Sequence, residues 1–128
     1  MNRIQRKSQM KDSRNLTPKI SVTEDRIYIY RDVIRLLGNP AFVCLLENED
    51  RHSIAFSPCE ESHAMSFRVP ERLLAGEKCD FRIHCKDFIA GLKERYHLTD
   101  EAKYIVSGKY VPEHNAVAFC FDDQPVNC

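Results

Sequence analysis

Short extended segments that end at prolines, glycines or polar turns dominate this sequence. β-Branched and aromatic residues fill positions 20–30, with a polar break at Glu24-Asp25. Comparable runs, alternating or strongly apolar, occupy residues 41–46, 52–57, 65–69, 80–85, 104–111 and 116–121. These runs predict strands, because successive side chains of a strand point to opposite faces. We therefore expect a mainly antiparallel sheet whose strands are joined by tight turns.

Two segments have the spacing of short helices. Residues 33–37 follow Asp32, whose carboxylate is suited to cap the first turn, and they end at Gly38, which tolerates the left-handed conformation of a helix end. In residues 88–96 the apolar side chains recur three and four positions apart. Both segments are expected to pack an apolar face against the sheet.

The two halves of the chain share an order of elements. At an offset of 55 residues, Arg31-Asp32 falls on Lys86-Asp87, and each half reads as strand, helix and hairpin. We interpret the halves as two βαββ pseudo-repeats, at 20–59 and 80–121, joined near Phe67. The expected fold class is α+β, with two helices on one face of a mainly antiparallel sheet.

The length of 128 residues suits a single domain, and the composition, 43% hydrophobic and 30% charged, is that of a globular chain. No run approaches the roughly 18 apolar residues of a membrane helix. The basic start is not followed by the apolar stretch of a secretory signal. These features predict one domain at 20–128 in the cytoplasm.

Charge is distributed unevenly, although the net charge is zero. Residues 1–19 carry six basic residues against Asp12 alone, a net charge of +5, and the remainder carries −5. The segment has no sustained apolar period, and Pro18 prevents a helix from running through it. We interpret residues 1–19 as a flexible basic arm.

The arm is the strongest candidate for contact with a partner. Its spaced cations could follow phosphates, although the arm has no aromatic side chain to stack on bases. They could equally lie on an acidic protein surface, or the arm could be a solvated tail. The candidate partner-binding residues are Arg3, Arg6, Lys7, Lys11 and Arg14.

The sequence contains no glycine-rich phosphate loop, nucleophile elbow or zinc-protease motif. Cys59, His63, Cys79 and Cys85 could ligate zinc, but no Cys-x-x-Cys pair is present, and we expect no metal and no cofactor. Cys59 and Cys85 also have histidines nearby in the sequence, yet neither has a recognisable set of catalytic partners. The six cysteines are expected to be reduced thiols.

One resemblance rests on sequence motifs. The run from Arg35 to Leu46 contains Leu-Leu-Gly-Asn-Pro, and Ile54 to Cys59 reads Ile-Ala-Phe-Ser-Pro-Cys, followed by Phe67 to Pro70. This pattern resembles a group of small bacterial and prophage-borne proteins that have no assigned activity. The resemblance implies a bacterial or mobile-element setting, and it assigns a function to no residue.

These observations favour a non-enzymatic, intracellular binding or regulatory module that acts by protein contact. In a prophage setting, one version is an inhibitor of a host defence nuclease, as anti-CRISPR proteins are. The first alternative is a nucleic-acid-binding transcriptional regulator that uses the basic arm, and the second is a Cys/His metal site or thiol enzyme. Unpaired sheet edges also leave room for a homodimer.

Overall fold

The computed structural model describes residues 17–98 and 103–122. Within these residues, eight strands form one continuous sheet in the order β6-β4-β5-β9-β8-β2-β3-β7, and every neighbouring pair is antiparallel. The strands are β2 (Lys19–Thr23), β3 (Arg26–Tyr30), β4 (Phe42–Asn48), β5 (Ser53–Pro58), β6 (Ser66–Arg68), β7 (Asp80–His84), β8 (Lys103–Val111) and β9 (Ala116–Cys120). The helices are α2 (Arg31–Leu36), α3 (Glu71–Leu74) and α4 (Lys86–Arg95), with 3₁₀ turns η1 (Glu49–Arg51) and η2 (Pro112–His114).

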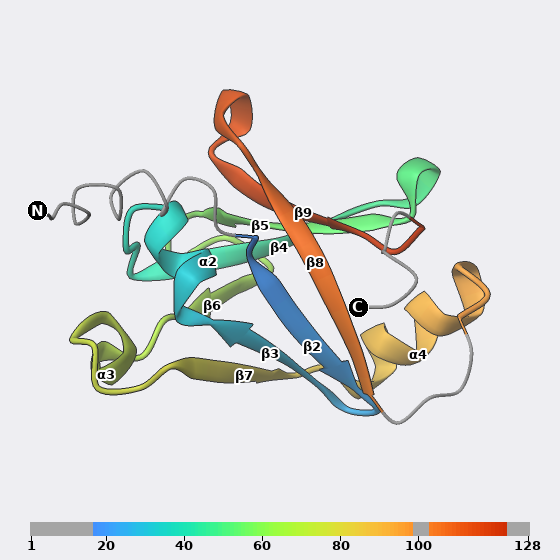
Figure 1. Ribbon diagram of the computed structural model, residues 1–128, viewed down its shortest axis with the longest axis horizontal. Helices are drawn as coiled ribbons and strands as arrows, with labels where there is room; N and C mark the ends of the chain where they lie inside the picture. The colour runs from blue at the N-terminus through green and yellow to red at the C-terminus, as the bar shows by residue number, and fades with distance from the viewer. Residues whose placement is uncertain (1–16, 99–102, 123–128) are drawn as a thin grey trace, which may run out of the picture.

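Strand β8 joins the two halves of the sheet. Residues 103–107 pair with β2, whereas residues 108–111 pair with β9, so one long strand belongs to both halves (Figure 1). The partner changes at Gly108, whose amide donates to the carbonyl oxygen of Pro18 at 2.7 Å. Strands that pass from one half of a folded sheet to the other form the corners of such structures. The eight strands consequently bend round a shared interior as a nearly closed barrel.

The core fills this interior and draws on both halves of the sheet. Alternate residues of the strands point inward and are almost fully buried, as the alternation of sequence predicted. The central side chains from strands are Ile20, Ile27, Ile29, Val43, Ile54, Phe56, Val117 and Phe119. The rings of Phe56 and Phe119 meet edge to face with centroids 6.2 Å apart. The apolar alternation therefore closes the sheet on itself rather than leaving one face for helices.

The predicted fold class, α+β with two helices on one face of the sheet, is wrong. Strands β3 and β7 are antiparallel neighbours, so the helices that follow them, α2 and α4, leave at opposite ends of the pair. Figure 1 shows α2 and α4 at opposite ends of the molecule. They bury Val33 and Ile34 at one end and Ile89 and Leu92 at the other. The protein is a mostly antiparallel, barrel-like sheet with short helices.

Several local predictions are confirmed and one is not. The polar break at Glu24-Asp25 separates β2 from β3, and Gly38 has the expected positive φ of 88°. Asp32, however, lies inside the first turn of α2, and the capping position is taken by Tyr30 without a side-chain hydrogen bond. Because β3 leads directly into α2, no residue is left between them to act as a polar cap.

None of the helices in the described ranges has the length and apolar character needed to cross a membrane.

Helix α4 is held against the sheet by a cluster around Glu47 of β4. Arg95 donates two hydrogen bonds to the Glu47 carboxylate, at 2.9 and 3.1 Å, and the Tyr96 hydroxyl donates a further one. The Tyr96 ring stacks on His52, with centroids 4.5 Å apart. Burial, together with the hydrogen bond to Glu47, raises the pKa of Tyr96, so this phenol stays protonated. The cluster fixes the end of α4 beside the β4–β5 hairpin.

Replacing Glu47 by alanine is expected to lower the free energy of unfolding by about 1–3 kcal/mol, because it leaves the 5% exposed Tyr96 and the Arg95 guanidinium without their acceptor. Urea unfolding followed by circular dichroism measures this loss. Glu49 is the matched control, because its side chain is 69% exposed and its contact with Arg95 is long, at 3.9 Å. Glu49→Ala should stay within about 0.5 kcal/mol of the wild type. Equal losses in both variants would contradict this account of α4 docking.

Candidate functional site

The outward face of strands β8, β2, β3 and β7 carries a regular array of side chains. The alternation that points Ile20, Ile27, Ile29 and Ile83 inward points every other residue of these strands away from the core. The strand registers align these residues into three rows across the four strands. The rows are Lys103, Thr23, Arg26 and His84; Ile105, Ser21, Tyr28 and Arg82; and Ser107, Lys19, Tyr30 and Asp80. We call this array the tyrosine face.

The middle of the tyrosine face is aromatic and tightly organised. Ser21 is 1% exposed, lies between Tyr28 and Ile105 in its row, and shares a 2.7 Å hydrogen bond with the hydroxyl of Tyr30. The guanidinium of Arg82 lies 5.7 Å from the centre of the Tyr28 ring. Ile105, at 54% exposure, is a large apolar side chain left open to solvent. The face thus combines fixed aromatic rings with an exposed apolar residue, which suits contact with flat ligands.

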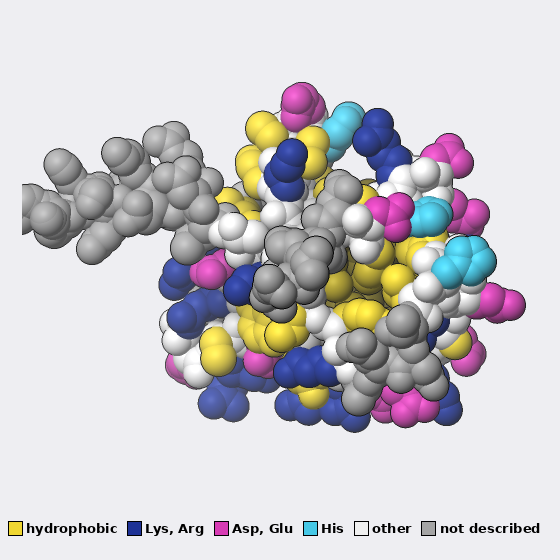
Figure 2. All heavy atoms as spheres, turned by 45° about the vertical axis from the view of Figure 1, so that its right-hand side comes forward, with side chains coloured by type: hydrophobic (Ala, Val, Ile, Leu, Met, Phe, Trp, Pro, Cys, Tyr) yellow, Lys and Arg dark blue, Asp and Glu magenta, His cyan; other side chains and the backbone are white. Residues whose placement is uncertain are grey.

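The charge of the tyrosine face is positive. Its twelve positions hold four basic residues, Lys19, Arg26, Arg82 and Lys103, and the single acid Asp80, with the histidine counted as neutral. Figure 2 shows many basic side chains along the lower part of the molecule, with some acidic ones among them. The excess of basic residues at the twelve positions gives the tyrosine face a positive charge on a chain whose total charge is zero.

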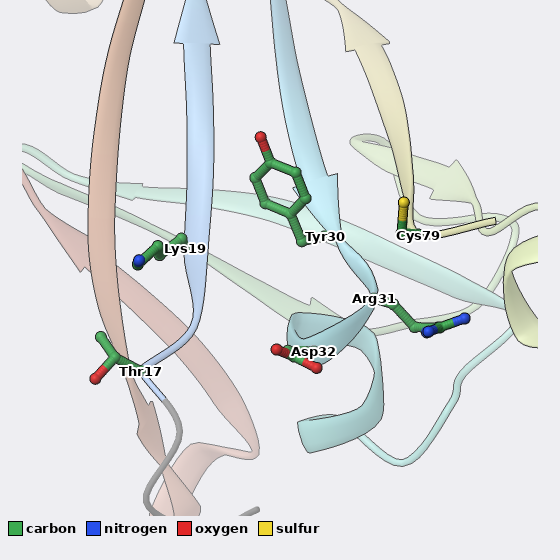
Figure 3. A pocket seen from close by; sticks show the side chains of 6 residues that line it. All are labelled: Thr17, Lys19, Tyr30, Arg31, Asp32 and Cys79. Carbon is green, nitrogen blue, oxygen red and sulfur yellow. The ribbon is translucent and has the colours of Figure 1, made fainter. Parts of the chain in front are cut away.

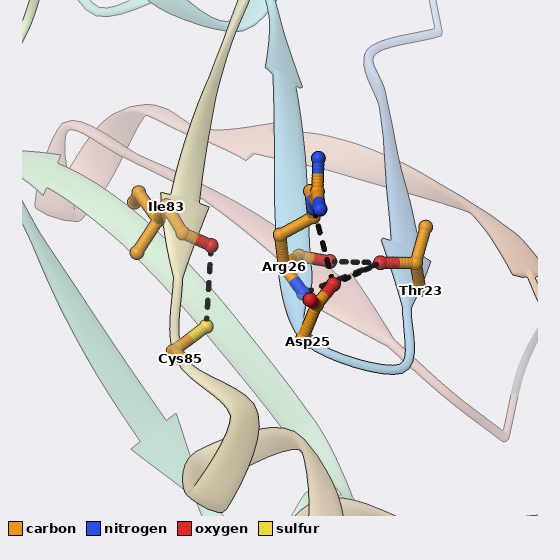
Figure 4. Close-up of polar contacts among 5 residues, drawn as sticks. All are labelled: Thr23, Asp25, Arg26, Ile83 and Cys85. Carbon is orange, nitrogen blue, oxygen red and sulfur yellow. Dashed lines mark hydrogen bonds and ion pairs between the residues drawn. The ribbon is translucent and has the colours of Figure 1, made fainter.

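Among residues 17–98 and 103–122, Arg26 is the one cation of the face that forms an ion pair with an acid. Its Nε donates to Asp25 at 3.1 Å, and the turn is closed by Thr23, whose hydroxyl donates to the Arg26 carbonyl oxygen (Figure 4). This network fixes the β2–β3 turn at one end of the face. Arg82, by contrast, packs on a ring, and its exposed guanidinium makes no ion pair with any described acid.

A hollow of about 590 Å³ lies at the other end of the face (Figure 3). Lys19 and Tyr30 border it, and Arg31 and Asp32 enter it from the start of α2. Arg31 points away from Lys19 and donates to the carbonyl oxygens of Gly76 and Lys78, at 3.0 and 3.3 Å. Nη1 of Arg31 is engaged by backbone carbonyls, its buried Nε has no hydrogen-bond partner among the described residues, and Asp32 adds a negative charge to this hollow.

The residues predicted from the sequence to contact a partner lie outside the described residues. These are Arg3, Arg6, Lys7, Lys11 and Arg14. The described chain begins at Thr17, which lines the hollow beside Lys19 and Tyr30. Lys19, the last residue of the predicted arm, lies in β2 and belongs to the tyrosine face, and the role of residues 1–16 in binding stays a prediction.

The structure separates the cysteines and the histidine considered as metal ligands. Cys59 ends the β5 side of the hairpin beside Cys44, His63 accepts the amide hydrogen of Met65 in an exposed loop, and Cys79 is exposed near the hollow. Cys85 begins α4 and donates to the carbonyl oxygen of Ile83 at 3.6 Å (Figure 4). Across residues 17–98 and 103–122, no three His, Cys, Asp or Glu side chains are grouped so that they could hold a metal ion.

The two thiols considered as nucleophiles are poorly suited to that role. Burial, with a smaller contribution from Cys44, raises the pKa of Cys59 to about 11. Burial, with a smaller contribution from Asp25, raises the pKa of Cys85 to about 11. Since the thiolate is the reactive form, both cysteines are held in the less reactive state at neutral pH.

The raised pKa of Cys85 predicts a loss of stability in alkali. The folded protein keeps this proton up to about pH 11, whereas the unfolded chain releases it near 9, so stability falls as the pH rises through this interval. Replacing Cys85 by alanine is expected to remove about 2 kcal/mol of that fall. Urea unfolding at pH 8 and at pH 11 measures the difference, with the exposed Cys79→Ala as control. An unchanged pH dependence in Cys85→Ala would contradict the burial of this thiol.

Sequence reasoning missed the tyrosine face. The signal was present in the alternation of Arg26, Tyr28 and Tyr30, which marks them as the outward set of one strand. The same alternation marks Arg82 and His84 as outward-facing residues of β7. The sequence does not say that β7 pairs with β3, and this pairing is what places Arg82 beside Tyr28. The three rows can be assigned only from the strand registers, which the sequence does not give.

Fold and face together define a barrel-like, antiparallel β-protein with a basic, tyrosine-bearing outer surface. The chain matches no family model, and it has no match among the curated proteins or among the solved structures. The similarity to small prophage-borne proteins accordingly stays a prediction from the sequence motifs. The assignment of a role depends on the chemistry of the tyrosine face itself.

Proposed function

We propose that this protein is a non-enzymatic, cytoplasmic binding module that holds single-stranded nucleic acid on the tyrosine face. The observation that carries the proposal is the row in which Arg82 lies over Tyr28 and Ile105 is exposed. Bases of single strands stack on aromatic rings and on guanidinium planes of β-sheet surfaces. Basic residues around such rings neutralise the phosphates.

The dimensions of the face support this proposal. Tyr28 and Tyr30 are two positions apart on β3, a separation of about 7 Å in an extended strand, so one base can stack at Tyr30 and a second on the Arg82 guanidinium that lies over Tyr28. Four strands at about 4.8 Å spacing give a width of roughly 14 Å, which places Lys103 and Arg82 on the two sides of the rings. The cations flank the rings as phosphate contacts on either side of stacked bases would require.

A protein partner is the competing proposal. The inhibitor of a host defence nuclease predicted from the sequence would also act without catalysis, and a basic surface also fits an acidic protein. The aromatic rows favour nucleic acid, because an acidic protein surface needs cations but not two ordered rings. Self-association through the unpaired edges of β6 and β7 stays a further prediction.

Fluorescence anisotropy with a labelled twelve-nucleotide oligothymidine tests the proposal on the full chain. Binding should be tighter to the single strand than to its duplex, and log affinity should fall with log salt with a slope of about −2 to −3, as three or four neutralised phosphates require. A variant with glutamine at Arg3, Arg6, Lys7, Lys11 and Arg14 separates the arm from the face. The proposal predicts that this variant keeps its preference for single strands.

Two outcomes would overturn the assignment. Complete loss of binding in the arm variant would move the site to residues 1–16. Failure of the wild-type chain to bind any oligonucleotide at 20–50 mM salt would exclude the tyrosine face as a nucleic-acid surface and leave the protein partner as the explanation of its charge.

A further inference from the structure

A second hollow, of about 720 Å³, lies between the start of β2, the end of α2 and the last part of β8. The hydrogen bond from Gly108 to Pro18 fixes the entry of the chain against β8 and so forms one wall. Residues from three separate parts of the chain therefore meet around one concave space. Its volume lies in the range of cavities that take small organic ligands.

The lining of this second hollow is apolar and basic. Pro18, Leu36 and Pro112 supply apolar walls, and the Tyr110 ring supplies an aromatic one. The Tyr110 hydroxyl donates to the Asn115 side-chain oxygen at 3.0 Å, which holds the ring in place. The second hollow thus has apolar and aromatic lining residues besides its charged ones.

Two cations, Arg35 and Lys109, complete the lining, and none of the described residues around this hollow is acidic. Both side chains are exposed, so their charged groups can reach a ligand at the mouth. Arg35 has an acidic neighbour one turn earlier, Asp32, but the two groups are 3.9 Å apart and largely open to solvent. Such a pair is weak and leaves the guanidinium able to bind an anion.

The positive charge of the second hollow favours an anionic ligand over the basic N-terminal segment of the chain. The chain that leads away from Thr17 toward the N-terminus is basic, with Arg3, Arg6, Lys7, Lys11 and Arg14 against Asp12. This segment would bring further positive charge to Arg35 and Lys109, whereas an anionic ligand neutralises them. An aromatic wall together with two cations fits a planar base that carries a phosphate.

We propose that the second hollow binds a nucleoside monophosphate, with the base against Tyr110 and Leu36 and the phosphate at Arg35 and Lys109. The choice of a nucleotide rests on the proposed function, because a strand on the tyrosine face could place its phosphorylated end here. Thr17 lines both hollows, so the second hollow lies next to the one at the rim of the face. The site itself is separate from the three rows and can be tested without them.

Nuclear magnetic resonance titration of the full chain with thymidine monophosphate, thymidine and inorganic phosphate tests this site. Thymidine monophosphate should shift the backbone amides of Gly108, Lys109 and Tyr110 with millimolar or tighter affinity, and each half of the ligand alone should bind at least tenfold more weakly. Lys109→Glu should weaken binding at least tenfold. Lys103→Glu, the same change on the same strand but on the tyrosine face, should leave it within twofold.

The result separates the two proposals. Weakened oligothymidine binding in Lys103→Glu, with unchanged binding of thymidine monophosphate, supports both sites. Absence of amide shifts at 10 mM thymidine monophosphate overturns the nucleotide site even if the oligonucleotide still binds the face. Inorganic phosphate that binds as tightly as the nucleotide overturns it too, because the base then contributes nothing. Equal effects of the two lysine variants on nucleotide binding also contradict it.

Discussion

Charge reversal at Arg82 is expected to weaken the binding of oligothymidine about 10- to 30-fold. Glutamate at this position removes a phosphate contact, removes the guanidinium from the Tyr28 ring, and adds a charge that repels the strand. The slope of log affinity against log salt should also become shallower by about one unit. Anisotropy titrations between 50 and 200 mM salt measure both quantities.

The matched control for this experiment is Arg72→Glu. Arg72 lies on α3, 72% exposed and paired with Glu77, away from the three rows, and its replacement changes the total charge by the same amount. Affinity in this variant should stay within about threefold of the wild type. If both reversals weaken binding equally, the strand responds to overall charge and the tyrosine face is not its site. Arg82 is exposed, so neither variant is expected to unfold the protein.

Alanine at Gly108 is expected to lower the free energy of unfolding by about 1–3 kcal/mol. An added Cβ would lie 2.5 Å from two atoms of the Phe119 ring and 2.7 Å from the carbonyl oxygen of Ala118. Phe119 is fully buried, so its ring cannot move aside without disturbing the core. The steric clash lies where β8 changes partners, so the strain falls on the corner of the fold. Urea unfolding measures the loss.

Two further variants test whether the clash with Phe119 is the cause. Phe119→Leu shortens the ring side chain, so combining it with Gly108→Ala should destabilise less than the sum of the single changes. Gly91→Ala is the glycine comparison. Its Cβ would lie 2.6 Å from Nη1 of Arg95 in α4 and would displace this side chain from Glu47, so the loss in this variant should not respond to Phe119→Leu. Strict additivity in the double variant would rule out the proposed contact.

Local periodicity predicted the strands well, because burial of alternate residues leaves a direct record in the chain. Residues 20–30 divide into two strands where the polar break predicted it, and the hairpin turns fall at Glu49–Arg51 and Pro112–His114. The fold class could not be predicted in the same way. It depends on β3 lying beside β7 and on β8 serving two partners, and both are pairings between distant segments.

The candidate site was hidden for the same reason. Tyr28 and Arg82 are unremarkable alone, as a tyrosine and an arginine on outward positions of separate strands. Only the register brings them into one row. The arm attracted attention in the sequence because its charges are contiguous along the chain, whereas the charges of the face are contiguous in space.

The pairing of β2 with β8 has a consequence for synthesis of the protein. Lys19 lies opposite Ser107, so the first described strand gains its second neighbour only after residues 103–107, more than 80 positions later, have left the ribosome. Until then β2 has one side open, and the interior cannot close. At translation rates of roughly 5–20 residues per second this delay lasts on the order of several seconds. During this interval the apolar side chains of Ile20 and Val22 are exposed to non-native contacts, because strand β8 is not yet present to complete the sheet.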